Sequence, residues 1–384
     1  MEQYCFDKVV NRRNTNSMKW NVGEKELPMW VADMDFETAP EVKEAIQNRA
    51  MHGCFGYAEV PESWYQAYIG WWERRHHFTL EKDWLLFCTG VVPAISSIVR
   101  KLTTPGEKVL LQPPVYNIFY NSIRNNGCTP MENALVFDGK GYHIDFEDLE
   151  EKLADPQTSL MLLCNPQNPS GKIWDEETLA RIGNLCAKYH VTVVSDEIHC
   201  DLTDPGKEYL PFASVNQECR DNSITCISPT KAFNLAGLQT AAISVPNPVL
   251  RHKVWRAINT DEVAEPNVFA VEAAVAAFTR GEAWLDALRR YIYENKQCAI
   301  RFIENRLPHI EVVPSEATYL LWLHCKDQKV NSAILAEQIR NKTGLYLSDG
   351  VQYGGDGIHF LRMNIACSRS QLQEGLARLE SALQ

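Results

Sequence analysis

The sequence predicts an α/β fold, with a mostly parallel sheet covered by helices in a large domain and a smaller α+β domain at the C-terminal end. Three observations support this prediction. Short, apolar, β-branched runs recur between residues 84 and 245, and helical stretches alternate with them. After about residue 280 the strands become fewer and helices flank them. With 384 residues, 45% of them hydrophobic, the chain is long enough to bury a sizeable core.

The first 40 residues predict an extended arm. They are polar at first and then rich in aromatic and apolar side chains that lack a helical period, most densely over 27–36. Such a segment is expected to lie on an apolar surface of its own subunit or of a neighbour.

Two helices and a glycine-punctuated loop follow the arm. Helices are predicted over 40–52, with a proline at the start, and over 63–76, which is rich in tryptophan. The loop 52–57 between them presents Phe55 and Tyr57. These rings either pack into the core or offer a phenol to a phosphate group.

The strands of the large domain are predicted from apolar runs of strand length without helical period. They cover 84–88, 107–112, 159–164, 191–195, 224–227 and 241–245. Helices are predicted between them, from the turn 89–93 to about 102, over 116–126 and over 175–190. Runs that are apolar on both faces and separated by helices indicate parallel strands.

The residues after 280 predict the smaller domain. A long amphipathic helix over 282–306 begins it, followed by strands over 318–325 and 359–367, a helix near 330–341 and a final helix from Ser370. We therefore expect an arm over 1–40 that packs with the small domain and a neighbouring subunit, a large domain over 41–280 and a small domain over 281–384.

Charge and composition argue against several classes of function. The net charge is −11, with acidic and basic residues mixed along the chain, which disfavours a nucleic-acid-binding face or a patch for anionic membranes. The N-terminus lacks a basic segment followed by an apolar core, and no apolar run is long enough to span a bilayer. No two of the twelve cysteines have CxxC spacing, so we expect reduced thiols and a cytoplasmic location.

A lysine in the turn after a buried strand is the first candidate for chemistry. Lys231 lies in the turn 228–237, directly after the apolar run 224–227. Open α/β sheets bind ligands at the carboxyl ends of their strands, where burial lowers the pKa of an amine and frees it as a nucleophile toward a carbonyl cofactor. A surface lysine in a loop is the alternative, and this turn alone does not decide between the two.

Two other loops carry polar groups that the fold alone does not require. Residues 89–92 begin a helix whose amides form an anion site, and Gly90 permits close approach to it. The loop 165–171 contains two Asn–Pro pairs, which impose a rigid non-helical turn and point side-chain amides outward.

Charged residues also occur at the ends of or inside apolar strands. Asp196 ends a buried strand, where a carboxylate is costly unless it is paired, and a protonated pyridine nitrogen would be such a partner. Asp196, Glu197 and His199 lack further ligands at helical spacing, so we expect no metal. Arg362 lies inside an apolar strand and should have a carboxylate partner, from the protein or from a substrate.

Taken together, these residues resemble the fold-type I pyridoxal-phosphate enzymes, the aspartate aminotransferase superfamily. Nearly the whole chain takes part in the resemblance. Within the superfamily it resembles the MalY/PatB branch, whose members are cystathionine β-lyases, also called cysteine C-S lyases. The segments that carry the resemblance are Leu27–Phe36, Phe55–Tyr57, Gly90–Ala94, Leu162–Pro169, Ser195–His199 and Lys231–Asn234, together with Arg362.

The resemblance implies pyridoxal 5′-phosphate as cofactor and a homodimer with shared active sites. Lys231 would form the Schiff base with the cofactor and remove the substrate α-proton, and Asp196 would keep the pyridine nitrogen protonated so that the ring accepts electrons. Asn168 would hydrogen-bond the ring hydroxyl and help Arg362 to bind the substrate carboxylate. The other expected cofactor contacts are Gly90, Val91, Val92, Tyr116, His199, Ser228 and the catalytic Tyr57, which would reach the phosphate from the partner subunit.

One departure from the superfamily bears on the reaction. Many aminotransferases carry an arginine eight positions after the lysine, where this chain has Gln239. A neutral glutamine pairs less strongly with phosphate, and the C-S lyase branch resembles this chain in lacking the arginine, which favours a lyase.

The resemblance therefore predicts a carbon–sulfur β-lyase that cleaves L-cystathionine or related cysteine S-conjugates to a thiol, pyruvate and ammonia. A class I/II aminotransferase on the same scaffold is the alternative, because the two reactions share their early steps. A regulatory protein that uses the scaffold to bind a partner is a third possibility, which the intact set of Lys231, Asp196 and Arg362 disfavours.

Overall fold

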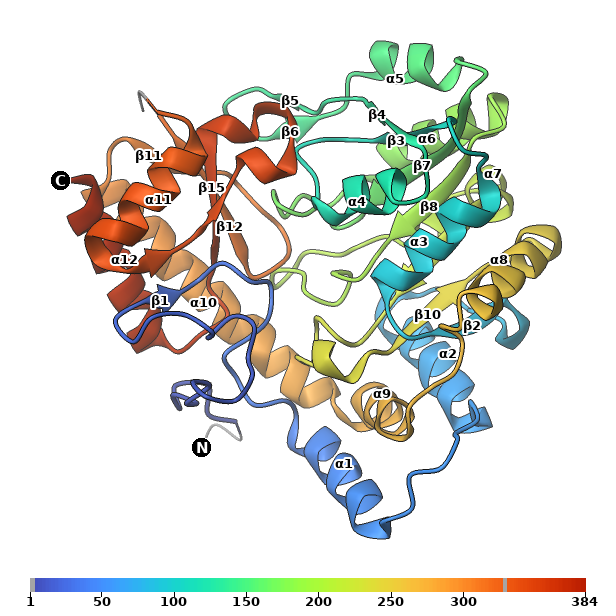
Figure 1. Cartoon of the computed structure of the whole chain (residues 1–384), viewed down its shortest axis with the longest axis horizontal. Coiled ribbons are helices and arrows are strands. Elements are labelled where there is room, and N and C mark those ends of the chain that lie inside the picture. Colours follow the sequence, from blue (N-terminus) through green and yellow to red (C-terminus); the bar gives the residue numbers. More distant parts are fainter. Residues whose placement is uncertain (1–3, 327–329) are drawn as a thin grey trace.

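A computed structural model describes residues 4–326 and 330–384 of the chain. Its largest sheet has seven strands (Figure 1). In spatial order they are β2 (Leu85–Cys88), β10 (Ala241–Ser244), β9 (Ser223–Ile227), β8 (Thr192–Asp196), β7 (Thr158–Cys164), β3 (Lys108–Leu111) and β4 (Thr129–Glu132). Six of these strands run in the same direction and β10 runs in the opposite one, so the predicted mostly parallel sheet is confirmed.

Helices cover both faces of this sheet. Alternate residues of β7 point to opposite faces: Leu160 and Leu162 join one apolar cluster, and Met161 and Leu163 join another. The first cluster includes side chains of α3 (Val91–Leu102), α4 (Ile118–Arg124) and α8 (Pro248–Thr260). The second includes side chains of α5 (Phe146–Leu153), α6 (Glu176–Lys188) and α7 (Gln217–Asp221). Burial on both faces explains why these strands are continuous apolar runs.

A second sheet of four strands follows later in the chain. Its order is β11 (Ile310–Val312), β12 (Leu320–Cys325), β15 (Phe360–Asn364) and β14 (Ser348–Asp349). The associated helices are α10 (Glu282–Arg306), α11 (Ser332–Thr343) and α12 (Arg369–Leu383). Gly281 alone separates α10 from α9 (Val268–Arg280), close to the expected boundary between the domains.

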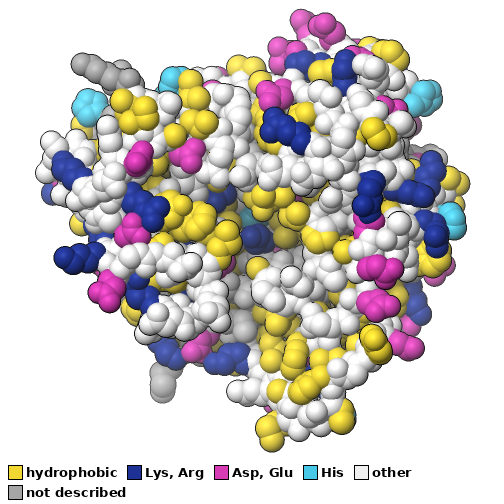
Figure 2. Space-filling view, viewed as in Figure 1, with side chains coloured by type: hydrophobic (Ala, Val, Ile, Leu, Met, Phe, Trp, Pro, Cys, Tyr) yellow, Lys and Arg dark blue, Asp and Glu magenta, His cyan; other side chains and the backbone are white. Residues whose placement is uncertain are grey.

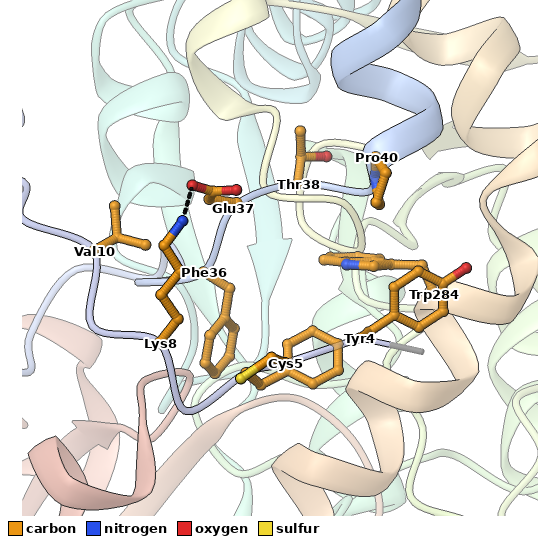
Figure 3. A pocket seen from close by; sticks show the side chains of 10 residues that line it. Tyr4, Cys5, Lys8, Val10, Phe36, Glu37, Thr38, Pro40 and Trp284 are labelled. Carbon is orange, nitrogen blue, oxygen red and sulfur yellow. Dashed lines mark hydrogen bonds and ion pairs between the residues drawn. The ribbon is translucent and has the colours of Figure 1, made fainter. Parts of the chain in front are cut away.

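The arm lies beside elements from the far end of the chain (Figure 1). Its strand β1 (Leu27–Pro28) pairs in parallel with β13 (Leu345–Tyr346). A small pocket of about 160 Å³ is lined by Tyr4 and Phe36 of the arm and by Trp284 of α10, among others (Figure 3). Residues 1–3 of the predicted arm lie outside the described residues, and contact with a neighbouring subunit stays a prediction.

A buried carboxylate holds the arm together. Asp35 is 4% exposed and accepts hydrogen bonds from Arg12 (2.7 Å), Lys19 (2.8 Å), Trp20 (2.7 Å) and Gln371 of α12 (2.8 Å). The two cations lower the pKa of Asp35, although burial opposes them. The arm is therefore fixed by a paired, hydrogen-bonded charge as well as by apolar contacts.

Several elements differ from the prediction. The helix expected over 116–126 is limited to α4, and the hairpin of β5 (Val136–Phe137) and β6 (Tyr142–His143) was not expected. Helices α1 (Pro40–His52) and α2 (Glu62–His76) agree with the predicted ranges within one residue. The loop between them leaves Phe55 and Tyr57 exposed, so the alternative that they pack into the core is wrong.

The structure also bears on the expected reduced thiols and on the expected lack of a membrane-spanning segment. All twelve cysteines are free thiols, and most are buried. Among the described residues, no helix combines the length and the apolar character that crossing a bilayer requires.

Candidate active site

A pocket of about 440 Å³ opens at the carboxyl ends of β7, β8 and β9, where the arm and the second sheet meet the first. Figure 2 shows that this face of the molecule is hollowed near its centre, with hydrophobic side chains around the hollow. The pocket brings together most of the predicted site residues. They are Gly90, Val91, Val92, Tyr116, Asn168, Asp196, His199, Lys231 and Arg362.

Lys231 lies in the turn after β9, partly buried beneath the arm. Its Nζ donates a hydrogen bond of 2.6 Å to the carbonyl oxygen of Ala32. Burial of the amine lowers its pKa to about 8, the charge of Arg362 adds to this effect, and Asp33 and Asp196 oppose it. A substantial fraction of neutral amine is therefore present near neutral pH, as a nucleophile or base requires.

Asp196 is the last residue of β8 and is 4% exposed. Its Oδ1 accepts a hydrogen bond of 3.1 Å from the amide of Ile198. Within the described residues it forms no ion pair, and burial raises its pKa to about 6, although Lys231 opposes the shift. A buried carboxylate in this state is suited to a cationic group of a ligand.

The neighbouring acid, Glu197, faces away from the pocket. Its carboxylate accepts hydrogen bonds from Ser195 (2.8 Å), the amide of Phe212 (3.0 Å) and the hydroxyl of Tyr209. Burial nevertheless raises its pKa to about 7. Glu197 therefore stabilises the segment after β8 through these hydrogen bonds, and it does not line the pocket.

Arg362 projects from β15 into the pocket and is 5% exposed. Its Nη1 donates to Asn168 Oδ1 (3.1 Å) and its Nη2 to the carbonyl of Trp30 (2.8 Å). No carboxylate of residues 4–326 or 330–384 pairs with it, and its buried Nε has no hydrogen-bond partner there. Within the described residues the expected partner is therefore not a protein carboxylate, which leaves the guanidinium for an anionic ligand.

The loop 165–171 positions Asn168 beside this arginine. Gln167 bonds the loop to Pro114, and the carbonyl of Gly171 accepts from the amides of Glu316 (2.9 Å) and Ala317 (3.0 Å). The loop is therefore attached both to the segment after β3 and to the segment before β12. This attachment explains how an asparagine from the first sheet reaches a guanidinium from the second.

Two rings complete the wall of the pocket. His199 is buried, its Nδ1 has no hydrogen-bond partner among the described residues, and burial with the charges of Lys231 and Arg362 lowers its pKa to about 3. The ring is therefore neutral and available to a ligand. Burial and the charge of Asp196 raise the pKa of Tyr116 to about 12, so its phenol stays protonated.

The first turn of α3 provides the anion site that the sequence predicted. Residues 89–93 line the pocket, and Gly90 precedes the helix. Free amides of a first turn favour a phosphate. Gln239 also lines the pocket, so the position that departs from many aminotransferases faces the site with a neutral amide.

Two predicted residues do not line the pocket of their own chain. Tyr57 is fully exposed on the loop before α2. Ser228 is buried, and its hydroxyl donates to the carbonyl of Thr240 (2.6 Å). Their roles at the phosphate stay predictions.

Sequence reasoning missed several lining residues. Tyr353 is 1% exposed, and its ring centroid is 5.1 Å from the guanidinium carbon of Arg362. A tyrosine within the glycine-rich stretch 350–355 was the signal that could have found it. Other lining residues that were not predicted as site residues come from the arm, from β14 and from the short helix after it, among them Trp30, Val31, Ala32, Ser348 and Gln352.

The residues present fit pyridoxal phosphate. An amine of lowered pKa suits its carbonyl group, and a buried acid without a counter-ion suits a protonated pyridine nitrogen. The helix N-terminus suits its phosphate. Arg362, with its free Nε, remains for the carboxylate of an amino acid.

Comparisons with known proteins agree with this fit. Residues 25–379 match the family "Aminotransferase class I and II". The chain is 41% identical to cystathionine β-lyase PatB of Bacillus subtilis, covering 98% of this chain and 99% of PatB, and 33% identical to protein MalY of Escherichia coli, covering 99% of both. The crystal structure of cystalysin from Treponema denticola, which contains pyridoxal 5′-phosphate, superposes with a TM-score of 0.96 at 31% identity, covering 99% of this chain and 98% of that one. The chain therefore belongs to the aminotransferase class I and II family of pyridoxal-phosphate enzymes.

Proposed function

We propose that this chain is a pyridoxal-phosphate-dependent carbon–sulfur β-lyase that cleaves L-cystathionine or related cysteine S-conjugates to a thiol, pyruvate and ammonia. The observation that carries the proposal is that one pocket contains two buried ionisable groups without an ion-pair partner among the described residues, the guanidinium of Arg362 and the carboxylate of Asp196. The likeness to cystathionine β-lyase PatB, together with a neutral Gln239, favours elimination over transamination.

Arg362 and Asn168 bind and orient the substrate in this proposal. The guanidinium pairs with the α-carboxylate, using the Nε that has no hydrogen-bond partner among the described residues. Asn168 accepts from Arg362 through Oδ1, which directs its Nδ2 group to the cofactor or the substrate. Fixing the carboxylate in this way brings the α-hydrogen toward Lys231.

Lys231 and Asp196 handle the protons. When bound, pyridoxal phosphate supplies a carbonyl for the substrate amine and a protonated ring that accepts the electron pair of the broken Cα–H bond. The neutral amine of Lys231 takes the α-proton at Nζ, and its pKa of about 8 makes this form accessible. Asp196 would hold the proton on the pyridine nitrogen through its carboxylate. The sulfur would leave Cβ as a thiolate with the electron pair of the C–S bond, and hydrolysis of the remaining aminoacrylate by water would give pyruvate and ammonia.

We also propose that the active unit is a homodimer in which Tyr57 of each subunit reaches the phosphate site of the other. Met51 (85%), Phe55 (56%) and Tyr57 (102%) are highly exposed around one loop. Figure 2 shows hydrophobic side chains at the lower end of this face, where Figure 1 places α1. Adjacent exposed apolar side chains are typical of an interface.

Product analysis tests the reaction type. The purified protein receives pyridoxal phosphate and L-cystathionine, with and without a 2-oxo acid. Release of pyruvate and ammonia without the oxo acid supports β-elimination. Amino-group transfer to the oxo acid without pyruvate release would overturn the lyase proposal in favour of an aminotransferase.

Replacing the lysine tests the assignment of the amine. Lys231→Ala should remove the absorbance of the Schiff base and lower turnover by about three orders of magnitude or more, because nucleophile and base are lost together. The measurements are the visible spectrum and the initial rate. Lys207→Ala, which removes an exposed lysine paired with Glu316, is the control and should leave both unchanged. Full activity in Lys231→Ala would contradict the assignment.

A further inference from the structure

The backbone of the arm contacts both cations of the pocket. The carbonyl of Trp30 accepts from Arg362 (2.8 Å), and the carbonyl of Ala32 accepts from Lys231 (2.6 Å) and from the hydroxyl of Tyr319 (3.1 Å). These carbonyls can accept hydrogen bonds from Arg362 and Lys231 only if the arm is held in a fixed position. Two asparagines, one from each sheet region, hold it there.

Asn364 of the second sheet is hydrogen-bonded to the backbone of the arm. It ends β15, is 1% exposed, and its Nδ2 donates to the carbonyls of Val31 (2.6 Å) and Asp33 (2.6 Å). These two carbonyls flank that of Ala32 in the chain. Both amide hydrogens of Asn364 are therefore used to fix the peptide groups on either side of the one that receives Lys231.

Asn234, in the turn 228–237 that contains Lys231, is also hydrogen-bonded to the backbone of the arm. Its Oδ1 accepts from the amide of Met34 (3.1 Å), and its Nδ2 donates to the carbonyls of Met34 (3.0 Å) and Phe36 (2.9 Å). It lies three residues after Lys231 and adopts a left-handed backbone conformation, with φ of 55°. The turn that carries the lysine is thus bonded directly to the segment that carries its acceptor.

We propose that Asn364 and Asn234 are positioning residues that fix the carbonyl of Ala32 as the acceptor for the Lys231 amine whenever this amine is not bonded to the cofactor, and so determine where the free amine lies and how firmly it holds its proton. The inference rests on the proposed function in taking Lys231 as the reactive amine. A carbonyl acceptor stabilises an ammonium group more than a neutral amine, because the ammonium is the stronger donor. Loosening the arm should therefore make Lys231 easier to deprotonate.

Other groups also act on Lys231 and must be held constant. Arg362 of β15 favours its neutral form, and Asp33 of the arm and Asp196 of β8 favour its charged form. His199, which also faces Lys231, is neutral. The substitutions tested here replace none of these side chains, but Asn364→Ala also frees the backbone of Asp33, and movement of its carboxylate away from Lys231 would lower the pKa in the same direction.

The test measures the proton affinity of Lys231 in the full-length chain freed of cofactor. The rate at which acetic anhydride acetylates Lys231 is followed as a function of pH by peptide mass spectrometry. Two variants are compared with the parent. Asn364→Ala removes the side-chain hydrogen bonds to Val31 and Asp33. Asn234→Gly removes those to Met34 and Phe36, and glycine tolerates the positive φ at this position.

We expect both variants to lower the pKa of Lys231 by about one unit, the size expected for a lost hydrogen bond to a charged group. The effect of Asn364→Ala is the more telling, since Asn364 reaches Lys231 only through the arm. Asn133→Ala is the matched control. It removes a fully buried amide that donates to Asp145 and Asp148 away from the pocket, and should leave the pKa of Lys231 unchanged.

An unchanged pKa in folded Asn364→Ala and Asn234→Gly would overturn the inference, and so would an equal shift in Asn133→Ala. Thermal unfolding of each protein shows which variants are folded. If Asn364→Ala does not fold, Asn364→Ser, which keeps one donor, takes its place and should give a smaller shift of the same sign. The labelling needs neither substrate nor turnover, so its outcome is independent of whether the lyase activity is found.

Discussion

Asp196 keeps a carboxylate in a place where its charge has no partner within the described protein. Its pKa is about 6 in the folded chain and about 3.8 as an ordinary carboxyl, so the folded state binds the proton more tightly than the unfolded state. The stability that this proton contributes is fully present below about pH 3.8 and is lost as the pH rises through about 6. At neutral pH the ionised group therefore destabilises the chain when no cofactor is bound.

Replacing this acid should stabilise the cofactor-free protein. Asp196→Asn should raise the free energy of unfolding at pH 7.5 by about 1–3 kcal/mol, and the gain should shrink as the pH falls toward 4. Urea titration at several pH values measures it. Asp83→Asn, at an exposed position, should show no such dependence. A gain in Asp196→Asn that is independent of pH would contradict the explanation.

Single residues were predictable from sequence where they interrupt a pattern. Lys231, Asp196 and Arg362 are charges in or beside apolar strands, and the structure brings all three into one pocket. Ala32 was not predictable because it acts through a backbone carbonyl, which every residue possesses. Tyr353 escaped because only the packing of the small sheet brings it to the arginine.

At the scale of elements, the loop 165–171 depends on a glycine at its end. Gly171 has φ of 71°, and a Cβ there would lie 2.6 Å from the carbonyl oxygen of Ala317 and 2.7 Å from Cβ of Ser315. Both the backbone conformation and the close approach exclude a side chain. The attachment of the Asn168 loop to the segment before β12 is therefore set by this position.

Gly171→Ala should lower the free energy of unfolding by about 2–4 kcal/mol and weaken retention of the cofactor, because the loop must shift from the backbone it contacts. Denaturant titration and the visible spectrum after dialysis measure these effects. Gly206→Ala is the matched control, since Gly206 has φ of 79° with nothing within 4 Å, and should cost only about 1–2 kcal/mol of backbone strain. Equal losses in both variants would rule out the steric cause.

The predictability of elements followed their local signals. Helix α10 has the predicted bounds, because a long amphipathic period is unambiguous. Strand β4 was missed because it is a sheet edge with no fully buried residue, and so it lacks an apolar run. Helix α4 begins two residues later and ends two residues earlier than the predicted range 116–126.

At the scale of the whole molecule, the proposed dimer makes each active site depend on two chains. Mixing Tyr57→Ala with Lys231→Ala subunits should restore activity that neither variant has alone, because one site of a hybrid dimer contains both native residues. Turnover after unfolding and refolding the mixture measures it, and each variant refolded alone is the control. No recovery, with hybrids demonstrated by mass, would contradict a shared site.

The arrangement of the chain was predictable in its order of strands and helices but not in its long-range pairings. The pattern of the sequence indicated the two sheets and an arm over apolar surface. It could not indicate that Leu27 pairs with Leu345, since no local rule relates residues so far apart. The division into an arm, a large domain and a small domain stays our proposal.

That pairing has a consequence for how the protein is made. The ribosome synthesises the arm before the segments that the arm contacts, and three of these, β13, Asn364 and Gln371, come much later in the chain. A nascent chain that already contains Asp196, Lys231 and Asn234 still lacks Arg362 and the later segments that also hold the arm. The site is therefore completed only after residues 345–371 have been synthesised, so a chain that stops before them lacks the means to bind an amino acid.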